Sequence, residues 1–179
     1  MKIVSIAIQK GGAGKTTTTV NLAAALRDTG KKCLLIDLDP QASLSQSLGI
    51  ADQPEPNIYH LLKREAAGDA APPEEAILKR CGMDILPSSL ELASAELELV
   101  SVYGREQILS QILQRLDGKY DYVLLDCPPS IGMLTVNALV ASLYLLMPVE
   151  AEFLSLKGAK SFLRHLDLVR RLNGKLDVL

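Results

Sequence analysis

The sequence has few of the residues that build disulfide frameworks and zinc sites. Its 179 residues include three cysteines, Cys33, Cys81 and Cys127, and two histidines, His60 and His165. They form no CxxC pair and no Cys/His cluster, and two of the cysteines lie in apolar, strand-like runs. We therefore expect buried, reduced thiols of a cytosolic protein, and we assign no role to either histidine.

Long hydrophobic runs and a strong excess of one charge are also missing. No apolar run approaches the roughly 18 residues that a membrane-spanning helix needs, and the N-terminal residues lack the layout of a signal peptide. The 19 basic and 21 acidic residues give a formal net charge of −2, which excludes a protein coated in positive charge but allows a local basic patch. Hydrophobic residues make up 48% of the chain, enough for one domain with a real core.

Short apolar runs alternate with helical patterns along the chain. Strands are predicted at Lys2–Ile8, Cys33–Leu38, Met83–Leu86, Tyr120–Leu125 and Leu143–Val149, and another strand begins at Lys175–Leu179. Helices are predicted at Lys15–Thr29, Ser43–Gly49, Ile58–Lys63, Glu74–Arg80, Leu90–Val100, Glu106–Leu116, Ile131–Ala141 and Leu156–Leu172. This order predicts an α/β fold with a mostly parallel sheet, helices on both faces and a ligand at the carboxyl ends of the strands.

A glycine-rich segment, QKGGAGKTT at residues 9–17, connects the first predicted strand to the first predicted helix. Glycines allow backbone N–H groups to approach phosphates, and a helix N-terminus adds further donors. Lys15 is expected to contact the β- and γ-phosphates, and the Thr16 hydroxyl to bind Mg²⁺. A plain glycine turn is the alternative to a nucleotide-binding loop, which would comprise Lys10, Gly11, Gly12, Ala13, Gly14, Lys15, Thr16 and Thr17.

The loop departs from the usual GxxxxGK[ST] pattern, because Gln9 takes the place of its first glycine and a second lysine, Lys10, follows. Lys10 cannot easily bend back onto phosphates that its own backbone holds. We expect it to reach the nucleotide of a facing subunit and to supply charge in the transition state, as an arginine finger does. The alternative is a lysine that only steers anions toward the loop.

Two further apolar runs end in aspartates, LLIDLDPQ at residues 34–41 and YVLLDCPP at residues 122–129. Asp126 has the Walker B form and is predicted to hold Mg²⁺. Asp39 is the candidate for orienting or deprotonating the attacking water, which makes Lys10, Lys15 and Asp39 the predicted catalytic residues. Segment 128–130 is a candidate switch. Acids also end strands for solubility, so each run alone is a weak signal. The candidate metal ligands are Thr16, Asp37 and Asp126.

These three segments, together with LMPVEAEFLSLKG at residues 146–158, resemble in order and spacing the ParA/Soj chromosome- and plasmid-partition ATPases. That family belongs to the deviant-Walker-A ATPases, which also include MinD. The resemblance covers essentially the whole chain and implies a P-loop NTPase-like three-layer fold. Family members usually continue for several more strands and helices, and the chain ends in what resembles the start of a strand. We therefore expect residues 1–179 to be a single P-loop ATPase domain that is incomplete relative to the family.

The resemblance implies an ATP-hydrolysing switch with ATP and Mg²⁺ as cofactors. It implies an ATP-dependent homodimer in which Lys10 contacts the nucleotide of the other subunit, with Lys15 and Thr16 on phosphate and magnesium, Asp39 as the catalytic aspartate and Asp126 as the Walker B acid. It further implies nonspecific DNA binding, stimulation of hydrolysis by a ParB/Spo0J-like adaptor, and a cytoplasmic, nucleoid-associated protein with no membrane partner. The alternatives are a MinD-like positioning ATPase of the membrane, an iron–sulfur-handling relative and a small-molecule P-loop kinase.

The last predicted helix has a basic stripe. Lys157, Lys160 and Arg164 share it with Arg171, on the side of the helix opposite Phe162, Leu166 and Val169. A basic stripe on an otherwise acidic protein is a candidate contact for DNA phosphates, with Lys157, Lys160 and Arg164 as its residues. The alternative is the solvated face of an amphipathic helix.

Overall fold

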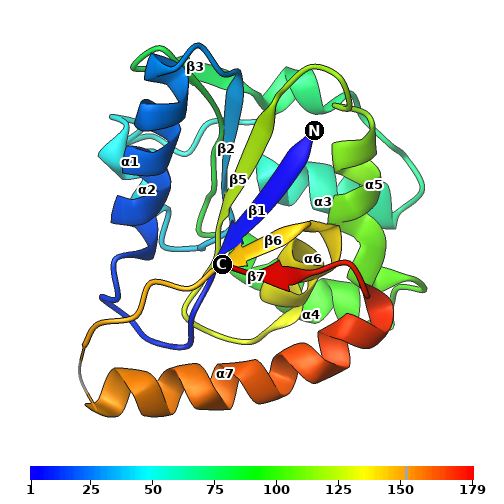
Figure 1. Cartoon of the computed structure of the whole chain (residues 1–179). Helices are drawn as coiled ribbons and strands as arrows, with labels where there is room; N and C mark the ends of the chain where they lie inside the picture. The colour runs from blue at the N-terminus through cyan, green and yellow to red at the C-terminus, as the bar shows by residue number, and fades with distance from the viewer. Residues whose placement is uncertain (152) are drawn as a thin grey trace.

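A seven-stranded sheet forms the centre of the molecule in the computed structural model (Figure 1). The structure describes residues 1–151 and 153–179, and the side chains of these except residues 153–157 and 161. The strand order is β3-β4-β2-β5-β1-β6-β7, and neighbouring strands are parallel except β3 and β4. The strands are β1 (Lys2–Ile6), β2 (Cys33–Asp37), β3 (Leu78–Arg80), β4 (Met83–Leu86), β5 (Tyr122–Asp126), β6 (Tyr144–Leu146) and β7 (Asp177–Val178).

Helices cover both faces of this sheet. The α-helices are α1 (Lys15–Asp28), α2 (Ser43–Ser47), α3 (Ile58–Ala66), α4 (Leu92–Glu98), α5 (Ile108–Gln114), α6 (Met133–Ala141) and α7 (Phe153–Leu172). Short 3₁₀ helices are η1 (Pro73–Ala76), η2 (Leu99–Ser101) and η3 (Arg105–Gln107). In Figure 1, α1 and α2 lie on one side of the sheet, α3, α4, α5 and α6 on the other, and α7 runs across its lower edge.

Side chains of the central strands alternate between two apolar cores. Leu34 and Ile36 of β2 belong to the larger core, together with residues of α3, α4, α5, α6 and α7. Leu35 belongs to the smaller core, together with residues of α1 and α2. Val123 and Leu124 of β5 divide in the same way. Because successive side chains of a strand point to opposite faces, a run that is apolar throughout needs cover on both sides. The α/β fold predicted from the sequence is confirmed.

A third, small apolar cluster joins the glycine loop to α7. It contains Ile8, Ala13 and Ala159, with Met147 packed against it. Ala159 of α7 therefore packs against the loop that connects β1 to α1.

The prediction of a helix over Glu74–Arg80 is wrong. The segment forms the single 3₁₀ turn η1, followed by β3, which pairs antiparallel with β4 in the register Arg80–Met83. Cys81 (φ 50°) and Gly82 (φ 71°) form the connection, and two consecutive residues with positive φ are the geometry of a tight hairpin turn. Cys81 is consequently exposed, contrary to the expectation of buried thiols, while Cys33 and Cys127 are buried.

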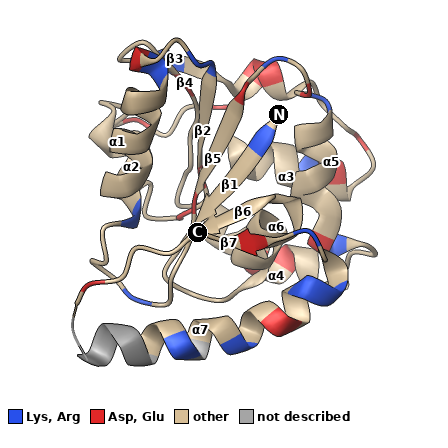
Figure 2. Ribbon diagram, in the orientation of Figure 1, with Lys and Arg blue, Asp and Glu red and all other residues tan. Residues whose placement is uncertain are grey.

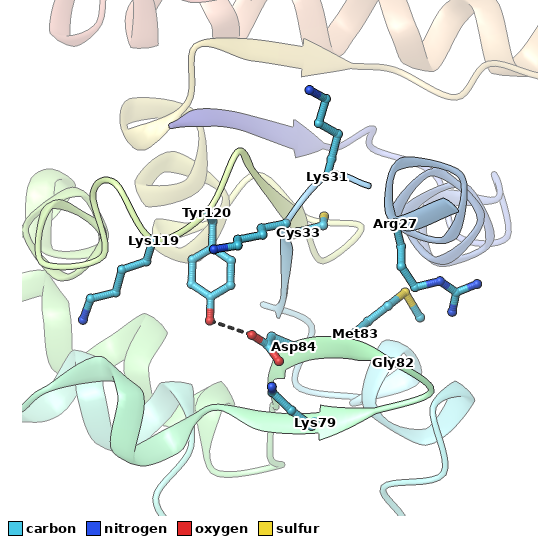
Figure 3. A pocket seen from close by; sticks show the side chains of 10 residues that line it. Arg27, Lys31, Cys33, Lys79, Gly82, Met83, Asp84, Lys119 and Tyr120 are labelled. Atoms are coloured by element: carbon cyan, nitrogen blue, oxygen red, sulfur yellow. Dashed lines mark hydrogen bonds between the residues drawn. The ribbon is translucent and has the colours of Figure 1, made fainter. Parts of the chain in front are cut away.

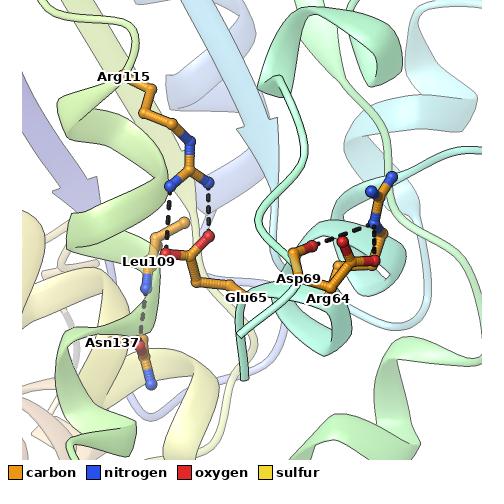
Figure 4. A network of polar contacts seen from close by, with 6 residues as sticks. All are labelled: Arg64, Glu65, Asp69, Leu109, Arg115 and Asn137. Carbon is orange, nitrogen blue, oxygen red and sulfur yellow. Dashed lines mark hydrogen bonds and ion pairs between the residues drawn. The ribbon is translucent and has the colours of Figure 1, made fainter. Parts of the chain in front are cut away.

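Polar contacts connect the helices on the α3–α5–α6 face (Figure 4). Arg115 donates two hydrogen bonds to the Glu65 carboxylate, at 2.6 and 3.1 Å, and so links the ends of α5 and α3. The amide oxygen of Asn137 in α6 accepts a hydrogen bond from the Leu109 N–H in α5 at 3.1 Å. Bidentate arginine–carboxylate pairs fix orientation as well as distance, so α3 and α5 keep a defined mutual position. Among the described residues, no helix is both long and apolar enough to span a membrane.

Candidate functional site

The three sequence segments that were expected to share a site meet at one edge of the sheet. Ile6, the last residue of β1, is in register with Asp126, the last residue of β5, and Asp126 is in register with Asp37, the last residue of β2. The parallel strands thus place the glycine loop and the two aspartate segments side by side. This edge is the carboxyl end of the sheet, where α/β proteins bind their ligands.

The glycine loop surrounds an open cavity of about 300 Å³. Gly12 (φ +71°) and Gly14 (φ +82°) adopt left-handed conformations that favour glycine, and Gly14 is the N-cap residue of α1. A Cβ atom added at Gly11, Gly12 or Gly14 would meet nothing within 4 Å, so the main chain of the loop is open to the cavity. The lining residues are Gly11, Gly12, Ala13, Gly14, Lys15, Thr16, Thr17, Asp39, Ser43 and Pro129.

Lys15 lies at the base of this cavity with only 8% of its surface exposed. Its ammonium group donates a hydrogen bond of 3.3 Å to the carbonyl oxygen of Lys10. One carbonyl satisfies one of the three donors of an ammonium group. A buried cation beside a loop of accessible main chain and a helix N-terminus gives the cavity the chemistry of an anion site.

Thr16 connects the loop to β5. Its hydroxyl donates a hydrogen bond of 2.6 Å to one carboxylate oxygen of Asp126, and the Thr19 hydroxyl lies 3.5 Å from the other. Burial raises the pKa of Asp126 to about 6, against the opposing effects of the Thr16 hydrogen bond and the charge of Lys15. A hydroxyl and a carboxylate are the hard oxygen donors that Mg²⁺ prefers, so these two residues fit a magnesium site.

Asp37 is fully buried, and its carboxylate is already engaged by the protein. It accepts hydrogen bonds from the backbone N–H of Ser45 at 2.8 Å, the Ser45 hydroxyl at 2.7 Å and the backbone N–H of Asp39 at 3.1 Å. Burial raises its pKa to about 7, and the neighbouring Asp126 contributes to the same shift. This geometry gives Asp37 the task of holding the segment from Asp39 to Ser45 in place. Its role as a metal ligand remains a prediction.

Asp39 is half-buried and lines the cavity opposite the glycine loop. One of its carboxylate oxygens accepts a hydrogen bond from the Gln41 N–H at 2.9 Å. The structure therefore places the predicted catalytic aspartate at the same cavity as Lys15 and Thr16. Its proposed action on water remains a prediction.

Lys10 forms an ion pair with Glu150, which follows β6. Both side chains are partly exposed, at 30% and 45%. Within one subunit the second lysine of the loop thus contacts an acid outside the residues that line the cavity. Its contact with the nucleotide of a facing subunit remains a prediction.

The predicted DNA-binding residues lie on α7. Lys160 and Arg164 are exposed, and Phe162, Leu166 and Val169 on the same helix are buried in the larger core. The side chain of Lys157 lies outside the described residues. The amphipathic character of the helix is as expected, and a role of its basic face in binding DNA remains a prediction.

Two polar contributors to this site escaped the sequence analysis. Ser45 anchors Asp37, as described above. Glu96 of α4 accepts hydrogen bonds from the backbone N–H groups of Met133 (2.5 Å) and Leu134 (3.3 Å), and so caps the start of α6, just after the segment that follows Asp126. Glu96 has no sequence signal, because a carboxylate that caps another helix can come from anywhere in the chain.

Comparison with known proteins identifies the family. Residues 1–178 match the AAA_31 family, described as an AAA domain. The chain is 42% identical to sporulation initiation inhibitor protein Soj of Bacillus subtilis, over 95% of this chain and 66% of Soj. It is 40% identical to chromosome partitioning protein ParA of Caulobacter vibrioides, over 99% of this chain and 67% of ParA. The chain belongs to the ParA/Soj family of partition ATPases.

Length and solved structures complete the comparison of this ParA/Soj family member. An uncharacterised protein of Mycobacterium tuberculosis is 42% identical over 99% of this chain, which spans only 56% of that relative. A cobyrinic acid a,c-diamide synthase of Mycobacterium smegmatis, solved with ADP and magnesium, superposes with a TM-score of 0.93 at 39% identity, over 99% of this chain and 72% of that one. A plasmid partition protein of Borrelia burgdorferi gives a TM-score of 0.84 at 31% identity, over 99% and 76%.

Proposed function

We propose that residues 1–179 form a P-loop ATPase domain of an ATP-hydrolysing partition switch. The observation that carries the proposal is the contact of Thr16 with Asp126 beside the buried Lys15. It joins a phosphate-type loop to a strand-end carboxylate, as a nucleotide site that uses Mg²⁺ requires. The family membership and the ADP and magnesium in the Mycobacterium smegmatis structure support ATP and Mg²⁺ as the cofactors.

Different residues of this chain bind the phosphates, hold Mg²⁺ and act on the attacking water. The open main chain of the loop and the Lys15 ammonium bind the phosphates, and Thr16 and Asp126 would hold Mg²⁺, which neutralises charge on the β- and γ-phosphate oxygens when bound. Asp39 accepts a proton from the attacking water or orients it toward the γ-phosphate. Pro129, at the same cavity, places segment 128–130 where a filled site would contact it.

The switch would act through dimerisation. In a homodimer formed with ATP, Lys10 would leave Glu150 and contact the nucleotide of the other subunit. The dimer would bind DNA without sequence preference, with Lys157, Lys160 and Arg164 of α7 as candidate contacts. A ParB/Spo0J-like adaptor would stimulate hydrolysis, and the protein would act on the nucleoid in the cytoplasm.

The test measures ATP turnover with Mg²⁺, together with sedimentation with and without ATP and DNA. We expect slow hydrolysis, dimerisation only with ATP, and DNA binding only by the dimer. Co-sedimentation with liposomes in place of DNA would favour a MinD-like positioning ATPase. Turnover that depends on cobyrinic acid would favour the chemistry named for the Mycobacterium smegmatis protein instead. Absence of any magnesium-assisted nucleotide binding by the folded protein would overturn the proposal.

A further inference from the structure

A second and larger cavity, of about 480 Å³, lies at the opposite end of the sheet (Figure 3). Its walls come from the end of α1, the segment before β2, the β3–β4 hairpin and the segment before β5. Strands β2 and β5 run from this cavity to Asp37 and Asp126 at the glycine loop. Five residues at about 3.3 Å each separate the two sites by about 16 Å, so one ligand of ordinary size cannot occupy both.

Positive charge dominates the lining. One acidic residue, Asp84, faces five basic ones, although the whole chain has a net charge of −2. Figure 2 shows this concentration of basic residues around β3 and the nearby ends of β2 and α1. The basic residues are Arg27, Lys31, Lys32, Lys79 and Lys119.

Part of this charge is neutralised at the rim, and part is not. Arg27 pairs with Asp28, and Lys119 pairs with Glu74. Across the described part of the chain, Lys31, Lys32 and Lys79 make no ion pair. Like charges on one side of the molecule repel one another, and a bound anion would relieve that repulsion, most of all near Lys32, because Figure 3 shows Lys31 and Lys79 extending in different directions.

The single acid of the cavity, Asp84, is engaged in a hydrogen bond. Asp84 accepts a hydrogen bond of 3.0 Å from the hydroxyl of the half-buried Tyr120, as Figure 3 shows. Burial, and after it this contact, raise the pKa of Tyr120, so the phenol stays protonated and donates to Asp84. Asp84 is also the cross-strand partner of Lys79 in the β3–β4 hairpin, so its carboxylate offsets part of the charge of that lysine, whereas Lys31 and Lys32 have no such neighbour in the register of the hairpin.

We propose that this cavity binds a small anion built on a chain of phosphate groups, such as inorganic tripolyphosphate or a nucleoside polyphosphate. Its volume falls within the roughly 300–1,000 Å³ of small-molecule sites. Lysines bind phosphates as point charges without demanding a fixed geometry. Because the lysines line a depression formed by four segments, they suit a compact polyanion better than the extended backbone of a duplex. The inference does not depend on the proposed ATPase function, since it uses other residues at the other end of the sheet.

The experiment uses calorimetry with tripolyphosphate, in EDTA, on the Lys15→Ala variant, in which the glycine loop can no longer compete for phosphate. We expect saturable binding to one site. The added double substitution Lys32→Ala/Lys79→Ala should weaken it by about tenfold or more. Both lysines are exposed, so we expect the variant to fold, as melting by circular dichroism would verify. The matched control Arg170→Ala/Arg171→Ala removes the same charge from exposed positions of α7 and should change affinity by less than about twofold.

Three results would overturn the proposal. The first is no binding of tripolyphosphate to the Lys15→Ala protein, and the second is equal weakening by the control pair, which would mean a nonspecific charge effect. The third is a short DNA duplex that binds through Lys32 and Lys79 and that tripolyphosphate does not displace, which would make the surface a nucleic-acid interface. Magnesium–ATP binding by the Lys32→Ala/Lys79→Ala protein with Lys15 intact reports separately on the glycine loop, so failure of one proposal is distinguishable from failure of the other.

Discussion

The hydroxyl of Thr16 and the carboxylate of Asp126 form a hydrogen bond of 2.6 Å between the first turn of α1 and the end of β5. The residues are 110 positions apart in the chain. Their contact depends on the parallel pairing of β1 with β5, which brings the start of the helix to the end of the strand.

We expect Thr16→Val to remove magnesium dependence from nucleotide binding and to lower turnover by about 100-fold or more, because the site loses one of its two oxygen donors. Thr16→Ser keeps the hydroxyl and should retain most activity; equal loss in both variants would contradict this assignment.

Replacing Lys15 by alanine should abolish measurable binding of magnesium–ATP. Among the described residues that line the glycine-loop cavity, Lys15 supplies the one cation, and main-chain donors alone do not neutralise a triphosphate. Titration calorimetry measures the loss, and Lys63→Ala, a change in α3 outside the cavity lining, is the control. Affinity within about threefold of the unmodified protein would show that Lys15 does not bind phosphate.

The Asp39→Ala variant should bind ATP normally and hydrolyse it about 100-fold more slowly or worse, because its carboxylate acts on the water and not on the nucleotide. If ATP binding forms the dimer and hydrolysis dissociates it, the unmodified protein should return to monomer as it consumes the ATP. The variant should remain dimeric over the same time. Sedimentation over time distinguishes the two. Normal turnover by the variant would assign the water to another residue.

Lys10 should matter only when two subunits meet. Lys10→Ala is expected to keep monomer affinity for ATP within about threefold and to lose about 100-fold or more of the turnover, because the charge it supplies acts in the transition state of the other subunit. Mixing Lys10→Ala with Asp39→Ala protein tests this action directly. A mixed dimer contains one site with an intact Asp39 and a lysine from its neighbour, so activity should return. No recovery in the mixture would favour the simple anion-steering alternative.

The stability of the ligand-free protein should fall as pH rises through the range of its buried aspartates. Burial raises the pKa of Asp37 to about 7 and that of Asp126 to about 6, above the roughly 3.9 of an unfolded aspartate. Between these values the folded state holds more protons than the unfolded state, so the free energy of unfolding decreases with increasing pH.

Asp126→Asn removes one of these titrations. Urea unfolding between about pH 4 and 7, without Mg²⁺ or nucleotide, should show that the unmodified protein loses on the order of 2 kcal/mol more than the variant. Identical pH slopes for the two proteins would mean that Asp126 does not carry a raised pKa.

The sequence predicted the parallel core well because β2 and β5 are buried on both faces and are nearly continuous apolar runs, and because β1 is a β-branched run that is buried from Val4 to Ile6. It failed at Glu74–Arg80, where acidic and aliphatic residues favour a helix locally. The two-residue turn at Cys81 and Gly82 instead lets β3 add to the edge of the sheet. Of the missed residues, Ser45 lies eight positions from the Asp37 that it anchors, in a turn whose geometry the pattern did not predict, whereas Glu96 lies 37 positions from the Met133 N–H that it accepts from. Pattern along a sequence carries no information on such partners.

Ala13 of the glycine loop and Ala159 of α7 belong to one apolar cluster with Ile8, so the loop and the helix pack together. Closely packed groups move together, so a rearrangement of the loop when a ligand binds would shift α7 at Ala159 as well. A bulkier residue in place of Ala159 would wedge the two apart. The small side chain of Ala159 thus allows the close packing through which a movement of the glycine loop would be transmitted to α7, a helix of 20 residues.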